Sequence, residues 1–594
     1  MAGRQKNLYL LGNFAPIQTT VSDITCDVKG SIPEEFYGGQ YVRNGSNPLK
    51  DDTKHDIHWF DGDGMLTGVF FKRDPDTPGA QPVFSNQYIV TDVYGARKKS
   101  PWIYPVIPGM NTMIDPRSSS IKVAMSVVRT AAIVTASIWG WIARPIKRIG
   151  TANTSLFHHD GRVLATNEIG PPMRVFLPSL KTVGWFTGSQ AEGESDQEDP
   201  SMPYFGAPGL EGVYKEMTTA HPRVDRKTGE LILFHSTFLP PYINYSIVPQ
   251  GVPTNATPAL NQAVPGLKSG KLMHDFGVSH RHTVLIDTPV SLDPCRLRHG
   301  RPAVEYDPAG HTRLGVFPRH SPDRVKWYTT DACIVMHTVN TWDERDVNGY
   351  RVHTLLCRIN SLSSLYWMGG LDCPEWACPS EPECRLYYYQ FPSAGSSDHI
   401  VQQWALSVIP FEFPHVPGHL QMSATKYVYG CSMREGNFAT THNSCYKIDS
   451  LVKVNVESII RKGLDNPPSQ VHGCVDTRSI HEIINSQDPH DPIQVFALPP
   501  RHYAQECSFV PRKDGVSEDD GWLVTYVFDE AWLDDSGVPL PDAHSELWII
   551  DAVSMKEVVG RVILPQRVPY GMHGNWFSEE EILNQRGFHH YRNE

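Results

Sequence analysis

The chain has 594 residues, of which 40% are hydrophobic and 20% are charged. These fractions are those of a globular protein, and they exclude an intrinsically disordered chain. The chain has 53 Lys and Arg against 65 Asp and Glu, a formal net charge of −12. This acidic balance does not indicate a nucleic-acid-binding protein, which would carry an excess of basic residues.

The N-terminal segment, MAGRQKNLYLLGNFAP, contains one short apolar run that Asn13 and Pro16 interrupt. A secretory signal needs an apolar core of about 7–15 residues, so we expect a cytoplasmic protein. Cysteines in a reducing compartment are most simply free thiols, and we expect this state for the eleven in this chain. Cys373, Cys378 and Cys384 do not have the spacing of paired zinc knuckles, which favours structural or loop thiols over a metal site.

Short strand-like runs separated by turns continue through nearly the whole chain. They are rich in Val, Ile, Thr and aromatic residues and are bounded by Gly, Pro, Asp and Asn; examples are QYVRNG, MLTGVFF, ELILFHSTF, CIVMHTV, YRVHTLLCRI and GWLVTYVFD. No alternation with long helices accompanies them, so we predict an all-β closed structure, most easily a propeller. The length alone would suggest several domains, but we expect a single domain over residues 1–594. No fixed-period repeat gives the number of blades.

One segment, residues 118–148, departs from this pattern. Its centre, TAAIVTASIWGWIA, is a run of fourteen uncharged residues. Five cations flank that run: Lys122, Arg129, Arg144, Lys147 and Arg148. Because a spanning helix needs about 20 apolar residues, we expect the stretch to be too short to cross a membrane. Apolar residues beside cations, with Trp139 and Trp141 in the middle, favour a helix in the interface of an anionic leaflet over an ordinary buried helix.

Histidines are abundant, with 26 in the chain, and four of them stand at predicted strand edges or in tight Gly and Pro contexts. These are His221 in TTAHPRVD, His274 in LMHDFGVSH, His337 in CIVMHTVNTWDE and His573 in VPYGMHGNWF. Their dispersal excludes an HExxH zinc site, in which both histidines share one helical face. It suits a metal on the axis of a closed β structure, where each blade can contribute one side chain. Taken singly, each histidine is more often structural or exposed, so the spacing leaves both interpretations open.

Nine motifs follow one another over nearly the whole chain. They are GGQYVRNGSNP (38–48), HWFDGDGM (58–65), TANTSLFHHDGRVLATNE (151–168), TTAHPRVD (218–225), LMHDFGVSH (272–280), FEFPHV (411–416), ECSFVPR (506–512), EDDGWLVTYVFD (518–529) and GMHGNW (571–576). In this order they resemble the carotenoid cleavage oxygenase family of non-haem iron proteins, and the whole series is far more specific than any one motif. The resemblance implies a seven-bladed β-propeller with a dome of loops and helices over an iron on its axis.

The resemblance also implies a metal site made of histidines and glutamates. The histidines that would bind Fe(2+) are His221, His274, His337 and His573, and the glutamates outside them are Glu168, Glu412 and Glu506. A metal-bound imidazole donates its other N–H to an acceptor, and a carboxylate in that place fixes the ring. The alternative for each glutamate is a surface strand residue. For Glu412, which stands between two Phe, we expect burial beside a partner.

Family members add both atoms of O2 across a conjugated C=C bond, which breaks into two carbonyl products without an organic cofactor. The motifs look most like those of fungal members that cleave torulene to β-apo-4'-carotenal in neurosporaxanthin biosynthesis, and we expect that activity. The alternatives are central cleavage of β-carotene to retinal and cleavage of a resveratrol-type stilbene. Stilbene-cleaving relatives carry Lys before the first glutamate, where this chain has Asn167, and this argues against a phenolic substrate. A non-enzymatic carotenoid-binding propeller would need a lost His or Glu, and all seven are present.

The expected partners follow from that activity. Carotenoids are dissolved in membranes, so we expect the 118–148 segment to hold the enzyme peripherally on a leaflet while it extracts its substrate. The other substrate is O2, and no nucleic-acid partner is expected. The sequence does not indicate an oligomeric state.

Overall fold

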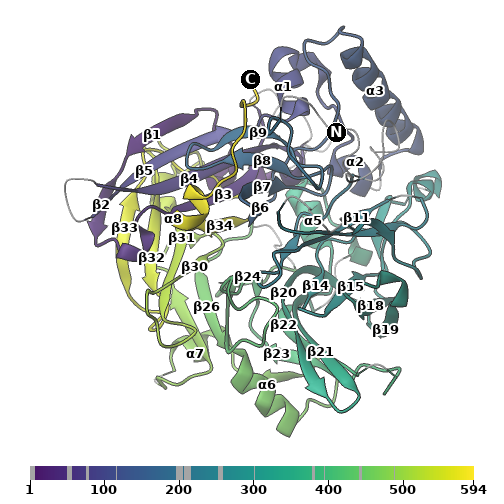
Figure 1. The fold of residues 1–594 in the computed structure, drawn as a ribbon, viewed down its shortest axis with the longest axis vertical. Coiled ribbons are helices and arrows are strands. Elements are labelled where there is room, and N and C mark those ends of the chain that lie inside the picture. The colour runs from purple at the N-terminus through teal and green to yellow at the C-terminus, as the bar shows by residue number, and fades with distance from the viewer. Residues whose placement is uncertain are drawn as a thin grey trace.

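The computed structural model describes residues 7–49, 57–74, 79–115, 117–195, 205, 216–237, 239–251, 259–299, 301–377, 381–393, 395–439, 445–486 and 488–593. Within these residues, seven sheets of four to six strands are arranged as the blades of a β-propeller (Figure 1). The all-β, seven-bladed fold that the sequence predicts is therefore confirmed.

We number the blades along the chain from the sheet that contains β3, and give the strands of each sheet in their hydrogen-bonded order. Blade 1 consists of β1 (Val21–Thr25), β5 (Ala80–Tyr88), β4 (Asp63–Arg73), β3 (Gln40–Asn47) and β34 (Gly574–Phe577). Blade 2 consists of β6 (Ser155–His159), β7 (Arg162–Thr166), β8 (Met173–Phe176) and β9 (Lys181–Trp185). Blade 3 consists of β10 (Arg223–Val224), β11 (Leu231–Ser236), β12 (Ile243–Val248) and β13 (Ala259–Ala263).

The remaining blades follow in sequence. Blade 4 consists of β14 (Gly277–Val278), β15 (His282–Asp287), β18 (His311–Pro318) and β19 (Lys326–Asp331). Blade 5 consists of β20 (Ile334–Asp346), β21 (Gly349–Ile359), β22 (Cys384–Phe391), β23 (Gln402–Ser407) and β27 (Cys474–Asp476). Blade 6 consists of β24 (Glu412–His415), β25 (Tyr427–Ser432), β26 (Ser450–Asn455) and β28 (Ile493–Ala497). Blade 7 consists of β2 (Asp27–Gly30), β33 (Val558–Ile563), β32 (Ser545–Asp551), β31 (Gly521–Asp529) and β29 (His502–Ala504), with β30 (Ser508–Pro511) also paired to β31.

Strands from the two ends of the chain close the ring. In blade 7, β2 pairs antiparallel with β33, in a register that places Asp27 opposite Ile563. In blade 1, β3 pairs antiparallel with β34, and Gln40 lies opposite Phe577. The first and last blades thus each combine N-terminal and C-terminal strands, so that the ring is held shut by backbone hydrogen bonds.

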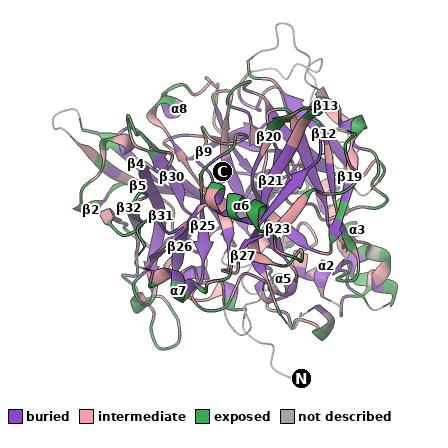
Figure 2. Ribbon diagram, turned by 90° about the horizontal axis from the view of Figure 1, so that it is seen from below, coloured by how far each residue is buried: buried purple, intermediate pink, exposed green. Residues whose placement is uncertain are grey.

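The blade strands are buried because each blade packs against a neighbour on either side (Figure 2). Every residue of β3 is buried, as is all of β31 except Asp529. Strands of this kind are rich in β-branched and aromatic residues, which fit a pleated surface. Between blades 5 and 6, for example, Tyr388 and Trp404 belong to one cluster with Val428 and Val452. The core is therefore a ring of such interfaces between blades.

Several connections between strands fold into a cap. The cap consists of α2 (Met110–Ile114), the paired strands β16 (Val290–Leu292) and β17 (Val304–Tyr306), and α5 (Ser363–Met368). Ile114, Tyr306 and Leu365 from these elements belong to one apolar cluster, against which Met336 and Phe413 also pack. Met336 and Phe413 directly adjoin His337 and Glu412 in the chain, so the cap covers the region of the predicted site.

The other α-helices of the described residues lie outside this cap. They are α1 (Asp92–Lys99), α3 (Ser120–Ile138), α6 (Val456–Asp465), α7 (Ile480–Ile484) and α8 (Glu579–Leu583). Of these, α3 stands at the periphery of the propeller (Figure 1). The Ser119 hydroxyl caps its start by accepting a hydrogen bond from the Lys122 N–H.

The helix within the 118–148 segment is longer than the part of it that lies in the uncharged run. Only the fourteen residues between Arg129 and Arg144 are free of charge, but the helix α3 has 19 residues because it starts at Ser120 and includes Lys122 and Arg129. At 1.5 Å per residue such a helix reaches about 28 Å, close to the thickness of a hydrocarbon core of about 30 Å. By length and composition alone, α3 is long and apolar enough to cross a membrane, unlike any other helix in the described residues.

The surroundings of α3 differ from those of a buried core helix. Ile121, Met125 and Val128 are 71%, 67% and 68% exposed. Trp139 and Trp141 follow the last turn, rather than lying in mid-helix, and are 67% and 74% exposed. The segment therefore exposes a contiguous apolar surface. This excludes the alternative interpretation of α3 as an ordinary buried helix.

The cysteines of the described residues are free thiols, as the sequence predicts. Cys384 is buried in β22, and Cys373 is partly buried. Cys378, the third cysteine of this group, lies outside the described residues.

Candidate metal centre

Each blade supplies one of the seven predicted site residues to a common centre. In the order of the blades, His573 directly precedes β34, Glu168 follows β7, His221 precedes β10, His274 precedes β14, His337 lies in β20, Glu412 begins β24 and Glu506 precedes β30. Short inner strands and their flanking turns thus bring together residues that are hundreds of positions apart in the sequence.

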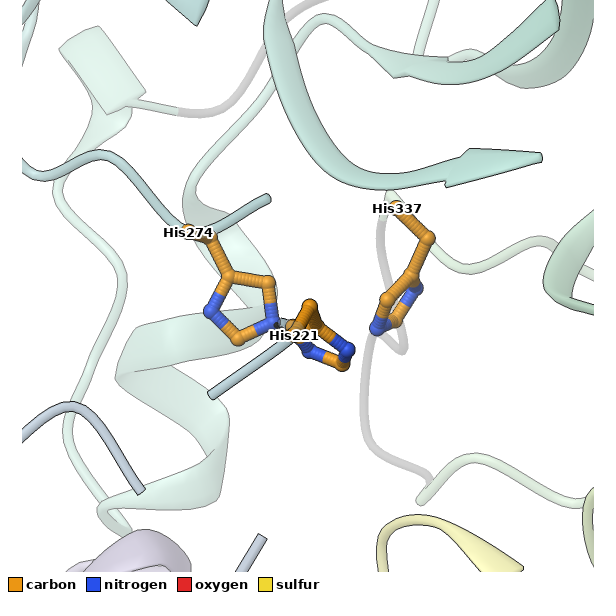
Figure 3. A group of neighbouring side chains, drawn as sticks. All are labelled: His221, His274 and His337. Carbon is orange, nitrogen blue, oxygen red and sulfur yellow. Dashed lines mark hydrogen bonds between the residues drawn. The ribbon is translucent and has the colours of Figure 1, made fainter. Parts of the chain in front are cut away.

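The four imidazoles converge. Nε2 of His221 lies 3.0 Å from Nε2 of His274, and Nε2 of His337 lies 3.2 Å from Nε2 of His573. Ligand atoms of His221, His274 and His337 lie within 4.8 Å of one another (Figure 3). The ring of His573 completes the group, with its centroid 4.7 Å from that of His221 and 4.8 Å from that of His337.

Three of these rings are each held by one carboxylate. Nδ1 of His274 is hydrogen-bonded to Glu168, Nδ1 of His337 lies 2.5 Å from Oε2 of Glu412, and Nδ1 of His573 lies 3.0 Å from Oε1 of Glu506. A carboxylate only accepts, so in each pair Nδ1–H donates and Nε2 is left with its lone pair. The carboxylates therefore choose the tautomer that points a metal-binding nitrogen at the centre.

The glutamates differ in their surroundings. The side chains of Glu412 and Glu506 are only 4% and 8% exposed, which agrees with the expectation of burial for Glu412. Glu412 Oε2 also accepts from the Phe413 N–H at 2.8 Å, and Glu506 Oε2 accepts from the Gly574 N–H at 2.8 Å. Glu168 is 41% exposed, so its pair with His274 faces an accessible space.

The protonation tendencies of the group bear on what it holds. Burial and the three neighbouring imidazoles keep the pKa of His221 well below its usual value. Burial also lowers the pKa of His573, although Glu506 opposes this. At His337 burial would lower the pKa, but Glu412 raises it. The surroundings therefore favour the neutral form of His221 and His573, whereas Glu412 favours a positive charge at His337.

The donor set fits a cation. Nδ1–H of His337 and of His573 each donates to a carboxylate, so in the neutral form of both rings two Nε2 lone pairs face each other at 3.2 Å. Such an arrangement is repulsive unless a cation lies between or beside the two nitrogens. Imidazole nitrogen suits Fe, Zn, Cu and Ni, whereas Mg and Ca prefer oxygen. The residues present would thus hold a transition-metal ion.

Two residues around the centre were not predicted from the sequence. Arg43 is buried, and its Nη2 donates to the carbonyl oxygens of Gly571 and Met572, at 2.7 Å each, in the segment that leads to His573. Phe413 has a φ of +50°, a left-handed conformation that is unusual for a non-glycine residue and typical of functional sites. The only sequence signal for either was its place inside a motif, YVRNG or FEFP.

The ring of Phe413 lies beside two of the imidazoles. The centroid of its ring lies 5.6 Å from that of His337 and 5.8 Å from that of His573. The left-handed backbone therefore serves to place an apolar face beside two of the four imidazoles. Asn167, next to Glu168, is buried and its amide contacts the Thr151 hydroxyl at 2.9 Å.

Comparisons with known proteins agree with this architecture. A family model described as retinal pigment epithelial membrane protein matches residues 14–578. The chain is 44% identical to the carotenoid dioxygenase carX of Gibberella fujikuroi, over 97% of this chain and 90% of that protein. It is 27% identical to a carotenoid 9,10(9',10')-cleavage dioxygenase of Crocus sativus, again over 97% and 90% of the two chains.

Solved structures with the same fold are more distant in sequence. A lignostilbene dioxygenase of Pseudomonas brassicacearum matches with a TM-score of 0.67 at 18% identity, covering 97% of this chain and 100% of that one. A variant of the Synechocystis apocarotenoid oxygenase matches with a TM-score of 0.63 at 20% identity, covering 95% and 97%. At such identities these structures support the fold alone.

The fold and the site define the class of protein as a seven-bladed β-propeller with four imidazoles and three carboxylates at its centre. The chain belongs to the carotenoid cleavage oxygenase family, because the family model covers most of its length and the fungal relative shares 44% of its residues. It is therefore an enzyme of the carotenoid cleavage dioxygenase type.

Proposed function

We propose that the chain is an Fe(2+)-dependent dioxygenase that cleaves torulene to β-apo-4'-carotenal, with His221, His274, His337 and His573 as the iron ligands. The observation that carries the metal is the pair of facing Nε2 atoms of His337 and His573, each on a ring whose Nδ1 is bound by a carboxylate. The substrate assignment is supported by 44% identity to a fungal carotenoid dioxygenase over nearly the whole chain.

The side chains of the centre divide the work. Neutral imidazoles leave the full charge on the ion, while the three glutamates outside them fix the rings and balance that charge at a distance. When bound, iron supplies the activation of O2 that oxidative cleavage of a C=C bond needs. The protein aligns one double bond beside the centre and excludes water from it.

The apolar cap is suited to aligning a hydrocarbon double bond beside the centre and to excluding water from it. Phe413 offers an aromatic face beside His337 and His573, and it packs on the cap cluster that contains Tyr306 and Leu365. A conjugated hydrocarbon binds to such surfaces by apolar burial, without needing a charged partner. Asn167 is engaged with Thr151 and offers no cation to a phenolate, which favours a carotenoid over a resveratrol-type stilbene.

We further propose that the 118–148 segment holds a cytoplasmic enzyme peripherally on a membrane leaflet. Support comes from the exposed residues Ile121, Met125, Val128, Trp139 and Trp141. The flanking cations contribute unequally. The guanidinium of Arg148 is paired with Glu192 at 2.7 Å and Glu216 at 3.2 Å, and that of Arg129 donates to three backbone carbonyls. Lys122 and Lys147 are exposed, so they are the cations best placed to meet anionic lipid.

A single domain over residues 1–594 remains our proposal for the organisation of the chain. It is supported by the pairing of β2 with β33 and of β3 with β34, which joins the two ends in one ring. The 118–148 segment is then an insert between blades 1 and 2 of that domain.

A substrate assay separates the candidate activities. The purified enzyme, loaded with Fe(2+) under anaerobic conditions, is supplied with torulene, β-carotene or resveratrol in detergent and then with O2. The proposal expects β-apo-4'-carotenal from torulene as the most rapidly formed aldehyde. Retinal from β-carotene, or a benzaldehyde from resveratrol, formed faster than the torulene product would contradict the substrate assignment.

The metal assignment is tested separately. His337→Ala should lose both bound iron and cleavage, because it removes one of the four converging nitrogens. The matched control is His320→Ala, whose side chain is 63% exposed and lies outside the centre. Iron content is measured per chain after anaerobic purification. Undiminished cleavage by His337→Ala would rule out the proposed centre.

A further inference from the structure

Asp275 connects three of the blades that carry the candidate metal ligands. It directly follows His274, and its side chain is 1% exposed. Arg223, two residues after His221, donates through Nη2 to both carboxylate oxygens of Asp275, at 2.8 and 2.7 Å. The N–H of Thr338, directly after His337, donates to Oδ2 of Asp275 at 2.7 Å. One carboxylate thus ties together segments of blades 3, 4 and 5.

Further hydrogen bonds strengthen this connection. The Thr338 hydroxyl lies 3.0 Å from Oδ2 of Asp275 and 2.8 Å from the carbonyl oxygen of Phe276, and Arg223 Nη2 lies 2.6 Å from the same hydroxyl. The Phe276 N–H donates to Oδ1 of Asp275 at 2.7 Å. Oδ2 therefore accepts from blades 3 and 5, through Arg223 and Thr338, whereas Oδ1 accepts from Arg223 and from the adjacent Phe276 N–H. A buried carboxylate with this many donors is costly to replace by any group that also donates.

The local backbone explains why such a tie is needed at His337. The register between β20 and β21 shifts on both sides of Thr338, which marks a bulge in the strand. A bulge re-aims a side chain and leaves a backbone group outside the ladder. Here the Thr338 N–H donates to Asp275, in the neighbouring blade, so Asp275 stabilises the bulge that turns His337 toward the other imidazoles.

We propose that Asp275 is a positioning residue for the metal centre, because it sets the relative placement of His221, His274 and His337 through Arg223 and Thr338. The inference rests on the proposed metal site. His573 lies outside this set and is positioned by Arg43 and Glu506 instead. Asp275 thus acts on the segments that carry three of the histidines, in addition to the glutamates that bind the rings of His274 and His337.

The test replaces Asp275 by Asn, which is nearly isosteric. In either orientation the amide nitrogen of Asn would face a donor now bound by Asp275, namely the Thr338 N–H or the Phe276 N–H. The matched control is Asp519→Asn, because Asp519 forms a buried pair with Lys453 at 2.9 Å in another part of the propeller. Both variants remove one buried carboxylate, but only the first one touches the segments that carry histidines.

A second pair of variants keeps the test decisive if Asp275→Asn fails to fold. Thr338→Val removes the hydroxyl and its three contacts, whereas Thr338→Ser retains it. For each full-length protein, apo samples are titrated with Co(2+). The d–d absorption reports coordination, chelator competition gives the affinity, and the apparent Tm of the apo protein gives the stability.

The proposal expects Asp275→Asn and Thr338→Val to bind Co(2+) about 10- to 100-fold more weakly, as is usual when a support of metal ligands is lost, and with altered d–d bands. Asp519→Asn and Thr338→Ser should keep the affinity and bands of the unmodified chain. Unchanged affinity and bands in Thr338→Val, or in a folded Asp275→Asn, would overturn the positioning role whatever happens to Tm. If the unmodified chain itself bound no Co(2+) or Fe(2+), the metal proposal would fall, and this inference with it.

Discussion

At the scale of single residues, the charge of each glutamate does more than hold a ring in place. Oε2 of Glu412 accepts from both His337 Nδ1–H and the Phe413 N–H. An amide in its place would still accept through one oxygen, but it would lose the negative charge that raises the basicity of the imidazole. The orientation of His337 and its strength as a ligand are therefore separable.

Glu412→Gln should weaken metal binding by about 10- to 100-fold while leaving the apo fold largely intact. Co(2+) titration and the apparent Tm measure the two effects. Glu457→Gln, on a side chain that is 55% exposed in α6, is the matched control and should change neither. An unaltered affinity in Glu412→Gln would show that this carboxylate is structural only.

The surroundings of Asp225, a residue outside the proposed metal centre, lead us to expect that the stability of the fold depends on pH. Burial would raise its pKa, but the hydrogen bonds from Arg319 and His280 lower the pKa from 3.8 to about 2. A carboxyl group with a depressed pKa stabilises the fold above the pKa of the unfolded chain, and this stabilisation is lost as the pH falls through the folded pKa. We therefore expect the apparent Tm to fall between pH 4 and pH 2. Asp225→Asn should have a lower Tm near neutral pH and a shallower fall in that range; an equally steep fall would assign the acid sensitivity to other groups.

At the scale of elements, α3 combines a folded helix with an exposed apolar face. Its inward contacts are made by residues such as Val123 and Ile133, which are both 7% exposed. The exposed residues Ile121, Met125 and Val128 lie on the rest of its surface. The packing contacts and the proposed membrane contact thus involve different side chains of one helix.

Replacing Ile121, Met125 and Val128 together by Ser should lower the retention of the enzyme on anionic vesicles without lowering its Tm by more than a degree or two. The reason is that, on the proposed membrane contact, apolar area at these positions is buried by lipid and not by the protein, at about 25 cal/mol per Å². Co-sedimentation and torulene turnover in vesicles are measured, with turnover of a small soluble alkene alongside. Val347→Ser, at a position 94% exposed, is the control. Equal losses on both substrates would point to a folding role for α3.

At the scale of the whole molecule, the closure of the ring depends on close backbone contact between its first and last segments. In β3, a Cβ built on Gly45 would lie 2.9 Å from Cα of Gly571, whereas no atom of the described residues lies within 4 Å of a Cβ built on Gly79. Backbone on both sides of the contact leaves no flexible side chain to move away. Gly45 therefore permits the approach of the 568–573 segment, which leads to His573.

Gly45→Ala should lower the stability by about 1–3 kcal/mol, the usual cost of overpacking, and should weaken metal binding because His573 is displaced. Thermal unfolding and Co(2+) titration follow the two effects. Gly79→Ala is the control, and it should leave both unchanged. A fully stable Gly45→Ala with normal metal affinity would show that the closure tolerates more adjustment than the backbone contact allows.

Much of this architecture could be predicted from the sequence, because β-rich runs such as that of β31 carry their own signal and the motifs place His221 and Glu412 in a known order. The number of blades came from the family resemblance, since no repeat in the sequence reveals it. The length of α3 does not follow from the uncharged run, because Lys122 and Arg129 interrupt the apolar residues without ending the helix. The hydrogen bonds of Asp275 to neighbouring blades cannot be predicted from the sequence, because they depend on how three blades are aligned in space.

The pairing of β3 with β34 also has a consequence for the order in which the enzyme is made. Synthesis proceeds from the N-terminus, and β3 emerges more than 500 residues before its partner at Gly574–Phe577. Until then, one side of β3 has no ladder partner, His573 is absent and the ring is open. The fourth nitrogen of the proposed metal centre and the closing strand are thus delivered by the same short stretch of chain. A chain truncated before this stretch can neither close its propeller nor complete the proposed centre, and its open strand edge favours aggregation or degradation.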